Sequence, residues 1–436
     1  MGLTELDLDG VRHLLVLVAH PDDETLVAGG LLADTPRHVP VDVVVASDGE
    51  ASHPRSPTHT PADLARIRRA EVREAVELLA PHAELHLLGL PDGFGGPHEG
   101  RGERIARIVD DVLRLSGDSA DEPVPGPGTL IVSTYRDDGH PDHEAVAEAA
   151  AAVAWRTDAR LVEAPIWLWH WRGEEHAPAD RLRAVTLSDR ARDLKARALA
   201  AHVSQVRPLS ERPGDEVLLP EEVLAHFRGP QERFVLAEPG ETSPFEELHG
   251  READPWQVRT SWYERRKRAL TLALLPQERY AAALELGCSV GALAQDLAQR
   301  CDRVVAVDES EAAVSSARAA LAGTVEVVHA RLPEDWERLE EVLRDGRAAD
   351  VRPDLVVVSE VGYFLSPGRL TALAGRIRDA LSHEEHATVL ACHWRHDIVG
   401  WPLDGDGVHA ILESHLGLTR RSHLVEDDVL LTVWTR

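Results

Sequence analysis

The sequence predicts an α/β protein of two domains, each a largely parallel sheet flanked by helices. The apolar run at residues 14–18 and the strand pattern at residues 283–286 each lead into a polar or glycine-containing turn and then a helical segment, as a parallel strand does when it feeds a helix. The chain has 436 residues, well above the usual domain size of about 100–150 residues. Residues 237–255 are rich in breakers and acids, which predicts a linker between the halves.

The first half alternates the patterns of strands and helices. Its short apolar runs, bounded by turn residues, read as buried strands. Apolar residues recur with helical spacing between residues 62 and 80, and this pattern predicts an amphipathic helix. The predicted strands lie within residues 14–18, 41–50, 85–88 and 129–134.

Two short histidine-containing motifs follow two of these strands. Residues 19–24 read Ala-His-Pro-Asp-Asp-Glu directly after the first strand, and residues 140–143 read His-Pro-Asp-His after the strand at 129–134. Ligands of open α/β sheets bind just beyond the carboxyl ends of the strands, so we expect the two motifs to meet in one crevice. Imidazoles and carboxylates suit zinc in an open catalytic site, and the acid and imidazole left over are then free to transfer protons.

The two motifs, in this order, resemble those of the PIG-L/LmbE-like family of zinc-dependent N-deacetylases. The resemblance implies a Rossmann-like fold and one Zn²⁺ ion that activates water for amide hydrolysis. It implies three metal ligands, which are His20, Asp23 and His143. It also implies that Asp22 is the general base, that His140 polarises or protonates the tetrahedral centre, and that Asp142 holds the ring of His140.

Other residues of this half also bear on the substrate. Arg68 and Glu71 suit an i,i+3 ion pair on the helix at 62–80, and an Arg of this family also reaches the substrate, so both roles stay open. Asp92, in the turn after the strand at 85–88, resembles an acid that contacts the substrate. The branch that deacetylates the mycothiol precursor has Tyr where this chain has Asp138, which argues against that substrate.

The second half opens with a helical pattern and a nucleotide-binding βαβ unit. Its later segments predict a fourth strand and a closing hairpin. The predicted elements are a helix at 262–274, a strand at 283–286, a helix at 292–299, a strand at 303–307, a strand at 354–358 and a hairpin at 418–436.

The glycines of this unit favour S-adenosylmethionine over NAD. The dinucleotide fingerprint needs a middle glycine so that the backbone can approach a pyrophosphate, and this chain has Cys288-Ser289 there. Glu285, at the end of the strand, suits a cationic amino-acid tail and is poorly placed for a pyrophosphate. Asp308 follows the first glycine by about 20 residues, the position of the acid that binds ribose hydroxyl groups.

This pattern resembles class I methyltransferases. The segments 254–256, 261–267, 359–363 and 393–394 further resemble the NodS-like methyltransferases, of which NodS methylates the amine left by deacetylation of a chitooligosaccharide. The resemblance implies a set of cofactor-binding residues: Glu285, Gly287, Cys288, Gly291, Asp308, Arg331, Leu332, Ser359 and Glu360. Tyr363 and His393 are candidates to contact the acceptor and help remove its proton.

The composition of the chain limits which kinds of partner and compartment we expect. The formal net charge of −28 argues against nucleic acid or an anionic membrane as a partner. The three cysteines form no disulfide framework, and no secretion signal or apolar run of about 20 residues is present, so we expect a cytoplasmic protein. The oligomeric state stays open.

The sequence therefore predicts a bifunctional enzyme. Residues 1–236 form the deacetylase, 237–255 the linker and 256–436 the methyltransferase. The substrate is a small amino sugar or its conjugate, which loses an N-acyl group and is then methylated on the freed amine. Two alternatives remain: transfer of the methyl group to a hydroxyl, or a second domain that binds its cofactor without catalysis.

Overall fold

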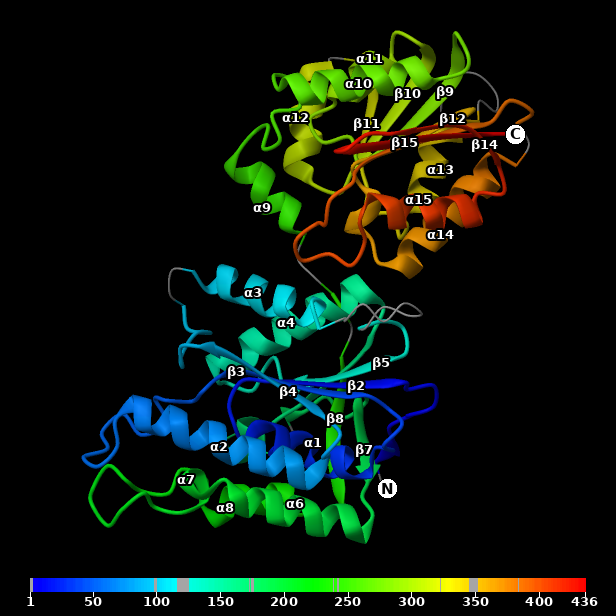
Figure 1. Ribbon diagram of the computed structural model, residues 1–436. Helices are drawn as coiled ribbons and strands as arrows, with labels where there is room; N and C mark the ends of the chain where they lie inside the picture. The colour runs from blue at the N-terminus through cyan, green and yellow to red at the C-terminus, as the bar shows by residue number, and fades with distance from the viewer. Residues whose placement is uncertain are drawn as a thin grey trace. The chain divides into compact units, whose positions relative to one another are not determined.

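The computed structural model divides the chain into two compact units, Met1–Glu241 and Thr242–Arg436, and each is an α/β domain as predicted (Figure 1). None of the helices in the described part of the chain combines the length and the apolar character needed to cross a bilayer. The structure describes residues 3–97, 100–115, 125–171, 173, 176–237, 239–240, 243–321, 323–344, 352–382 and 384–436.

The first unit contains one sheet of eight strands in the order β1-β7-β8-β6-β5-β2-β3-β4. Strand β8 is antiparallel to β6 and β7, and the other neighbouring strands are parallel. The strands are β1 (Thr4–Glu5), β2 (His13–Val18), β3 (Val41–Ser47), β4 (Glu84–Leu90), β5 (Thr129–Thr134), β6 (Arg160–Ala164), β7 (Leu182–Thr186) and β8 (Gln231–Ala237). The helices are α1 (Asp23–Asp34), α2 (Pro61–Leu79), α3 (Arg101–Leu113), α4 (Pro141–Thr157), α5 (Trp167–Trp171), α6 (Asp189–Ala201), α7 (Val203–Val206), α8 (Glu221–Leu224) and the 3₁₀ turn η2 (Ala225–Phe227).

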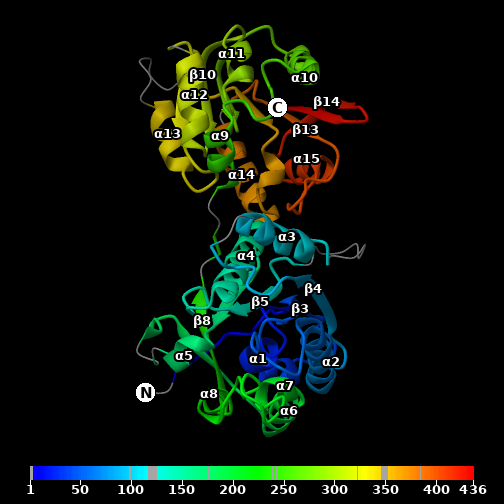
Figure 2. The ribbon, with the colours of Figure 1, turned by 90° about the vertical axis from the view of Figure 1, so that its left-hand side faces the viewer.

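Helices cover both faces of this sheet (Figures 1 and 2). Leu14, Val16 and Val18 of β2 pack into the core formed with α1, α2 and α6. Leu15 and Leu17 of the same strand point to the opposite face and pack with α3 and α4. Successive side chains of a strand point to opposite faces, so a strand buried on both sides reads as a continuous apolar run. This explains the run that the sequence shows at residues 14–18.

A buried ion pair holds the middle of α1. Lys195 of α6 donates from Nζ to the Leu26 carbonyl oxygen at 2.8 Å and to Glu232 Oε1 at 2.6 Å. The two oxygens of Glu232 accept from the backbone N–H groups of Gly30 and Leu31, at 2.6 and 2.8 Å. Lys195 and Glu232 are both buried. The pair therefore ties α1, the helix that begins with Asp23, to α6 and β8.

The second unit contains one sheet of seven strands in the order β11-β10-β9-β12-β13-β15-β14. Strand β15 is antiparallel to both of its neighbours, and the remaining pairs are parallel. The strands are β9 (Tyr280–Leu286), β10 (Cys301–Asp308), β11 (Glu326–His329), β12 (Leu355–Ser359), β13 (Thr388–Trp394), β14 (Thr419–Val425) and β15 (Val429–Thr435). The helices are α9 (Pro244–Arg251), α10 (Trp262–Leu274), α11 (Ala292–Leu297), α12 (Glu311–Leu321), α13 (Trp336–Arg344), α14 (Pro367–Ala380), α15 (Gly405–His415) and the 3₁₀ turn η3 (Gly362–Phe364).

Part of the range predicted to be a linker is helical. Residues 244–251 form α9, which packs near α12 in the second unit. Glu246 of α9 accepts from the Ser310 hydroxyl at 2.8 Å and from the Ala312 N–H at 3.3 Å. The breakers at Pro239, Gly240 and Pro244 hid this helix, because a proline at the first helical position starts a helix as readily as it marks a loop.

Candidate active sites

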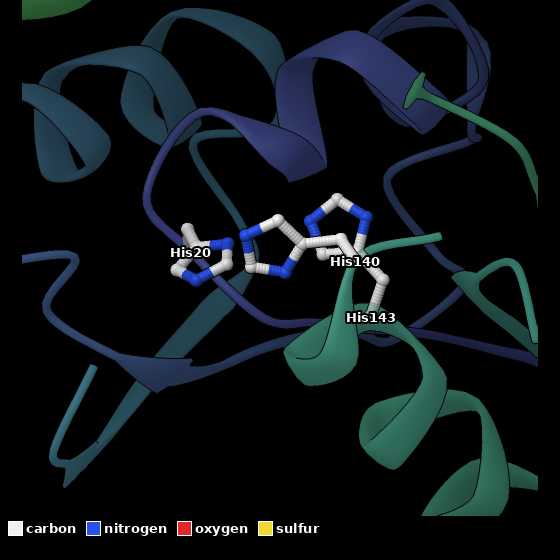
Figure 3. A group of neighbouring side chains, drawn as sticks. All are labelled: His20, His140 and His143. Carbon is white, nitrogen blue, oxygen red and sulfur yellow. The ribbon is translucent and has the colours of Figure 1, made fainter. Parts of the chain in front are cut away.

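The structure brings the two histidine motifs of the first unit together. His20 lies just past the carboxyl end of β2, while His140 precedes α4 and His143 lies in its first turn (Figure 3). Each of the three imidazoles has a nitrogen within 4.8 Å of a nitrogen of the other two. Strands β2 and β5 are adjacent and parallel, so their carboxyl ends meet at one edge of the sheet. Two motifs that are far apart in the sequence therefore lie together at one site.

The carboxylate of Asp23 lies between two of these rings. Its Oδ2 atom is 3.4 Å from His20 Nδ1 and 3.5 Å from His143 Nε2. Burial alone would raise the pKa of Asp23, but His143 and His20 outweigh burial and lower it. His143 Nε2 is buried and has no hydrogen-bond partner among the described residues. An imidazole nitrogen that is buried, unpartnered and aimed at a carboxylate is the arrangement a metal ion would complete.

In His20 and in His143, the ring nitrogen that faces away from Asp23 contacts another carboxylate. Asp138 Oδ2 lies 2.7 Å from His143 Nδ1, and Asp142 Oδ2 lies 3.2 Å from His20 Nε2. Such carboxylate–histidine pairs fix the ring orientation and tautomer of metal-binding histidines. No pattern in the sequence indicates that Asp138 pairs with His143, because the two side chains meet only once the turn before α4 has folded.

Asp142 differs from its predicted role. Its carboxylate accepts from the backbone N–H groups of Gly93 and Gly95, at 2.8 and 2.6 Å, in addition to contacting His20. Its contact with His140 runs through the backbone: the Asp142 N–H points at His140 Nδ1 at 3.3 Å. The side chain turns toward the Gly93–Gly95 turn because that turn offers two N–H donors. Asp142 therefore orients the ring of His20.

Arg68 pairs with Asp22, and the predicted Arg68–Glu71 pair is not formed. Arg68 Nη2 donates to Asp22 Oδ1 at 3.0 Å and to the Pro21 carbonyl at 2.7 Å, while Nη1 donates to the Gly49 carbonyl at 2.9 Å. Glu71 instead accepts from the N–H and the hydroxyl of Ser204, at 2.7 and 2.6 Å. Both side chains are buried, and each has a better partner across the helix interface than along the helix.

Burial tunes two further groups of this site. It raises the pKa of Asp22 to about 6, with Arg68 opposing and Asp23 adding to the shift. Burial, together with the nearby rings of His143 and His20, lowers the pKa of His140 to about 4. His140 is therefore neutral at pH 7 in this arrangement, and the predicted protonated form requires a new anion beside it. Asp92 Oδ1 lies 3.3 Å from His20 Nε2, so the structure places this predicted acid in the same cluster.

An aromatic pair flanks this cluster. The indoles of Trp167 and Trp171 stack with ring centroids 5.1 Å apart and an angle of 16° between their planes. Trp171 is 55% exposed and lies against Gly139, the residue before His140. Asp138 also anchors α5, the helix that carries both indoles. Its carboxylate accepts from the backbone N–H groups of Ile166, Trp167 and Leu168 at 2.9–3.1 Å.

In the second unit, a cavity of about 200 Å³ opens at the carboxyl ends of β9, β10 and β12. The predicted cofactor residues that line this cavity are Glu285, Gly287, Cys288, Asp308, Leu332, Ser359 and Glu360. Glu285 is 2% exposed, and its Oε2 atom has no hydrogen-bond partner among the described residues. Burial and the nearby Asp308 raise the pKa of Glu285 well above its usual value. A buried, unpaired carboxylate in a cavity wall favours a cationic ligand.

Two predicted cofactor residues do not line the cavity. Gly291 precedes α11 with φ of 76°, and a Cβ at this position would lie 2.6 Å from Leu321, so this glycine shapes the turn below the cavity. Arg331 pairs with Glu309 through Nε and Oε2 at 3.3 Å. Asp308 accepts from the N–H groups of Ser289 and Ser310, at 2.7 and 3.0 Å, and these bonds fix its carboxylate at the end of β10.

The two residues predicted to contact the methyl acceptor, Tyr363 and His393, lie in different surroundings. Tyr363 lines the cavity and donates its hydroxyl to Glu360 Oε2. His393 is absent from the cavity wall and is fully buried: its Nε2 accepts from the Gly362 N–H at 3.1 Å and its Nδ1 lies 3.0 Å from His409 Nε2. His393 therefore has no free nitrogen for an acceptor. It lies next to Trp394 in the sequence, and only the packing shows that its ring points into the core.

Other cavity residues were missed by the sequence analysis. Phe245 and His249 come from α9, and assigning this range to a linker concealed them. Trp256 lies in the segment 254–256 that resembles NodS, but the resemblance gave it no role in the site. Lys267 of α10 also lines the cavity. Lys195 and Lys267 are the chain's two lysines; both are buried, and each forms an ion pair with a glutamate. The rarity of lysine in this arginine-rich chain was the one feature of the sequence that could have marked these two positions.

Comparison with known proteins agrees with this division into two sites. Residues 15–154 match the family described as PIG-L: GlcNAc-PI de-N-acetylase, and residues 246–383 match the family described as Nodulation protein S (NodS).

Three similar proteins illustrate these matches. A probable N-acetyl-alpha-D-glucosaminyl L-malate deacetylase 2 of Bacillus anthracis is 33% identical over 147 residues, covering 32% of this chain and 58% of that protein. Nodulation protein S of Bradyrhizobium diazoefficiens is 31% identical over 115 residues, covering 26% of this chain and 49% of that protein. The crystal structure of a putative methyltransferase from Pseudomonas syringae is 41% identical, with 40% of this chain and all of that chain covered and a TM-score of 0.32. The chain thus spans about half the length of these two curated relatives.

Proposed function

This chain carries a PIG-L deacetylase domain followed by a NodS-like, S-adenosylmethionine-dependent methyltransferase domain, and we propose that the two act in sequence on one amino sugar. The first domain removes an N-acyl group, and the second methylates the amine that is set free. The product of the first reaction has the functional group that the second requires, and this chemical continuity supports the pairing in one chain.

The donor set of the first domain supports a zinc site held by His20, Asp23 and His143. Ligand atoms about 2.0–2.2 Å from a tetrahedral zinc lie about 3.3–3.5 Å apart. Asp23 Oδ2 lies 3.4 and 3.5 Å from the two histidine nitrogens, which matches this spacing. The buried, unpartnered Nε2 of His143 is the single observation that carries the proposal. A zinc ion held there would act as a Lewis acid and lower the pKa of a coordinated water to about 7.

The protein's own groups supply the proton transfers. Asp22 accepts a proton from the attacking water, and its pKa of about 6 suits a base that must be ionised near neutral pH. Arg68 holds the Asp22 carboxylate in place. His140 Nδ1 accepts from the Asp142 N–H, so the neutral ring carries its proton on Nε2 and donates a hydrogen bond to the amide oxygen as negative charge develops there. Asp22 then passes the proton of the attacking water to the leaving amine nitrogen. Asp138 and Asp142 keep the rings of His143 and His20 turned toward Asp23.

Two observations support an amino sugar as substrate. The relative from Bacillus anthracis is named for a glucosaminyl substrate, and we extend that class to this chain. The exposed indole of Trp171, stacked on Trp167 beside His140, offers a flat apolar face on which a pyranose ring can lie. Asp92, next to His20, is then the acid that contacts the polar groups of the sugar, while Arg68 acts through Asp22.

The second domain supports binding of S-adenosylmethionine, which supplies an electrophilic methyl group. Asp308 receives the ribose hydroxyls, and Glu285 receives the cationic amino-acid tail. Gly287 has φ of 76°, and a Cβ there would lie 2.7 Å from Val361, so only glycine fits at this turn in the cavity wall.

The order of the two reactions tests the proposal. An amide nitrogen is a poor nucleophile because its lone pair is delocalised into the carbonyl group. Asp22→Asn protein, supplied with S-adenosylmethionine carrying a labelled methyl group, should label no N-acetylglucosamine and should label glucosamine at the wild-type rate. Labelling of N-acetylglucosamine by this variant would show that the target is a hydroxyl. Absence of labelling from glucosamine in the wild type, with the cofactor bound, would support a second domain without catalysis.

A further inference from the structure

We infer that Glu360 is the base that takes the proton of the methyl acceptor, and that this acceptor is an amine. The inference rests on the proposed function of the second domain and assigns a role that Tyr363 and His393 cannot fill. Glu360 directly follows β12, next to Ser359, and lines the cavity.

The carboxylate of Glu360 is fixed from three sides. Lys267 Nζ donates to Oε1 at 2.8 Å, and the Trp394 N–H and the Tyr363 hydroxyl donate to Oε2. The backbone N–H of Glu360 donates to the Cys392 carbonyl at 2.9 Å and holds the residue at φ of 56°, where side chains other than glycine rarely occur. Despite these contacts the side chain is 26% exposed. A residue held in an unfavourable conformation with its charged end open to a cavity is a candidate for function.

The neighbouring groups cannot serve as the base. Burial and the Glu360 carboxylate raise the pKa of Tyr363 well above its usual value, so its phenol keeps its proton and acts as a donor to Glu360. Both nitrogens of His393 are engaged inside the core. Lys267 is held protonated by Glu360 and Glu264, each 2.8 Å from its Nζ. Glu360 is thus the acceptor-side group with proton-accepting capacity that adjoins the end of β12.

The charge balance around Glu360 favours a cationic acceptor. Two carboxylates, Glu264 and Glu360, each lie 2.8 Å from the single ammonium of Lys267, and the other cation of the cavity wall, Arg268, pairs with Asp296. An excess of negative charge attracts an ammonium group and does nothing for a neutral hydroxyl.

The strength of the base decides between nitrogen and oxygen. An amine such as an α-amino group has a pKa of about 8, so its conjugate ammonium gives up a proton to a carboxylate at moderate cost. A hydroxyl group resembles water, with a pKa of about 15.7, and is out of reach of a carboxylate. A domain with Glu360 as its base therefore methylates amines.

The step balances as follows. The substrate ammonium gives one proton to Glu360, which leaves a lone pair on the nitrogen. That lone pair forms the N–C bond as the S–C bond of S-adenosylmethionine breaks, and the sulfonium becomes a neutral thioether. The product leaves as a protonated secondary amine, and Glu360 releases its proton to water.

The test compares Glu360→Gln with the wild-type full-length protein, with glucosamine as acceptor and S-adenosylmethionine as donor. Single-turnover methyl transfer at pH 6.5 should fall by about 10²-fold or more, the usual size of a general-base effect. Binding of S-adenosylhomocysteine, measured by calorimetry, should change less than threefold. The rate of the variant should rise with pH and approach that of the wild type once the amine is deprotonated in solution. A merely structural role would not produce this recovery.

Two further variants keep the outcomes separate. Glu426→Gln breaks the Arg266–Glu426 pair outside the cavity and should leave the rate and its pH profile unchanged. A wild-type rate for Glu360→Gln at pH 6.5 would overturn the inference, as would a loss with high-pH recovery in Glu264→Gln alone. A wild-type protein that methylates no amine at any pH would instead overturn the proposed function.

Discussion

Asp138 Oδ2 lies 2.7 Å from Nδ1 of His143, and the same carboxylate accepts three backbone N–H groups at the start of α5. One buried acid therefore orients a histidine whose other nitrogen faces Asp23 and also fixes the helix that presents Trp167 and Trp171. The residue that the sequence analysis treated as a departure from a related branch connects the two halves of the deacetylase site.

Replacing Asp138 should weaken metal binding. Asp138→Ala removes the acceptor that fixes the ring of His143, and loss of such a partner lowers metal affinity by about 10–100-fold. Competition with a zinc chelator measures this affinity. Asp137→Ala, at the exposed neighbouring position, is the matched control and should bind zinc as the wild type does. Equal affinity in both variants would contradict the orienting role of Asp138.

The identity of the metal ligands can be read from metal content. Purified wild-type protein should hold about one zinc ion per chain, and His20→Ala, Asp23→Ala and His143→Ala should each lose it, because a catalytic zinc keeps three protein ligands. His140→Ala should retain the ion and lose deacetylation by about 10²-fold or more. If His140→Ala is also stripped of metal in elemental analysis, His140 belongs to the ligand set.

Glu285→Gln should change stability and cofactor affinity in opposite directions. The variant removes a buried carboxylate that has no partner, so the second domain should unfold at a higher temperature without cofactor. Binding of S-adenosylmethionine should weaken by about 1.5–3 kcal/mol, the size of a hydrogen bond to a charged group. Calorimetry gives both quantities, and Asp302→Asn, at an exposed pair with Arg279, should alter neither. Unchanged affinity in Glu285→Gln would remove this residue from the cofactor site.

Breaking the buried pair between Lys195 of α6 and Glu232 of β8 should strongly destabilise the first domain. Lys195→Ala leaves Glu232 buried without its ammonium partner, a change that typically costs about 3–5 kcal/mol. Arg192→Ala removes a partly exposed pair with Asp189 on the same helix and should cost less than about 1 kcal/mol. The free energy of unfolding of the first domain, measured with urea on the full chain, compares the two. Similar values would mean that solvent reaches the Lys195 site.

The second domain should lose stability in acid. Burial and Lys267 lower the pKa of His393 to about 3, and burial and His393 lower the pKa of His409 to about 2. Both rings stay neutral in the folded domain, whereas the unfolded chain binds protons below pH 6.5. The free energy of unfolding should therefore fall by about 1.4 kcal/mol per pH unit for each ring between pH 6 and pH 4. His409→Gln should flatten this slope in urea titrations, and His396→Gln, which pairs with Asp428 at the surface, should not.

The classes of the two domains and most of their elements follow from the amino-acid sequence alone. The strand at 129–134 and the helix at 262–274 have the predicted bounds, because a fully buried parallel strand and an amphipathic helix leave periodic patterns that need no tertiary information. The motifs containing His20 and His143 gave the proposed ligands for the same reason: each motif is contiguous in the chain.

The hydrogen-bond partner of each buried side chain depends on the tertiary structure. Glu71 accepts from Ser204, Asp142 accepts from the Gly93–Gly95 turn, and Arg68 donates to Asp22. The sequence placed His393 in the cavity, whereas packing directs its ring to His409. A buried polar group takes the donors and acceptors that surround it in three dimensions. Those neighbours come from segments far apart in the chain, so spacing along the sequence sets the inventory of groups and the fold sets their pairing.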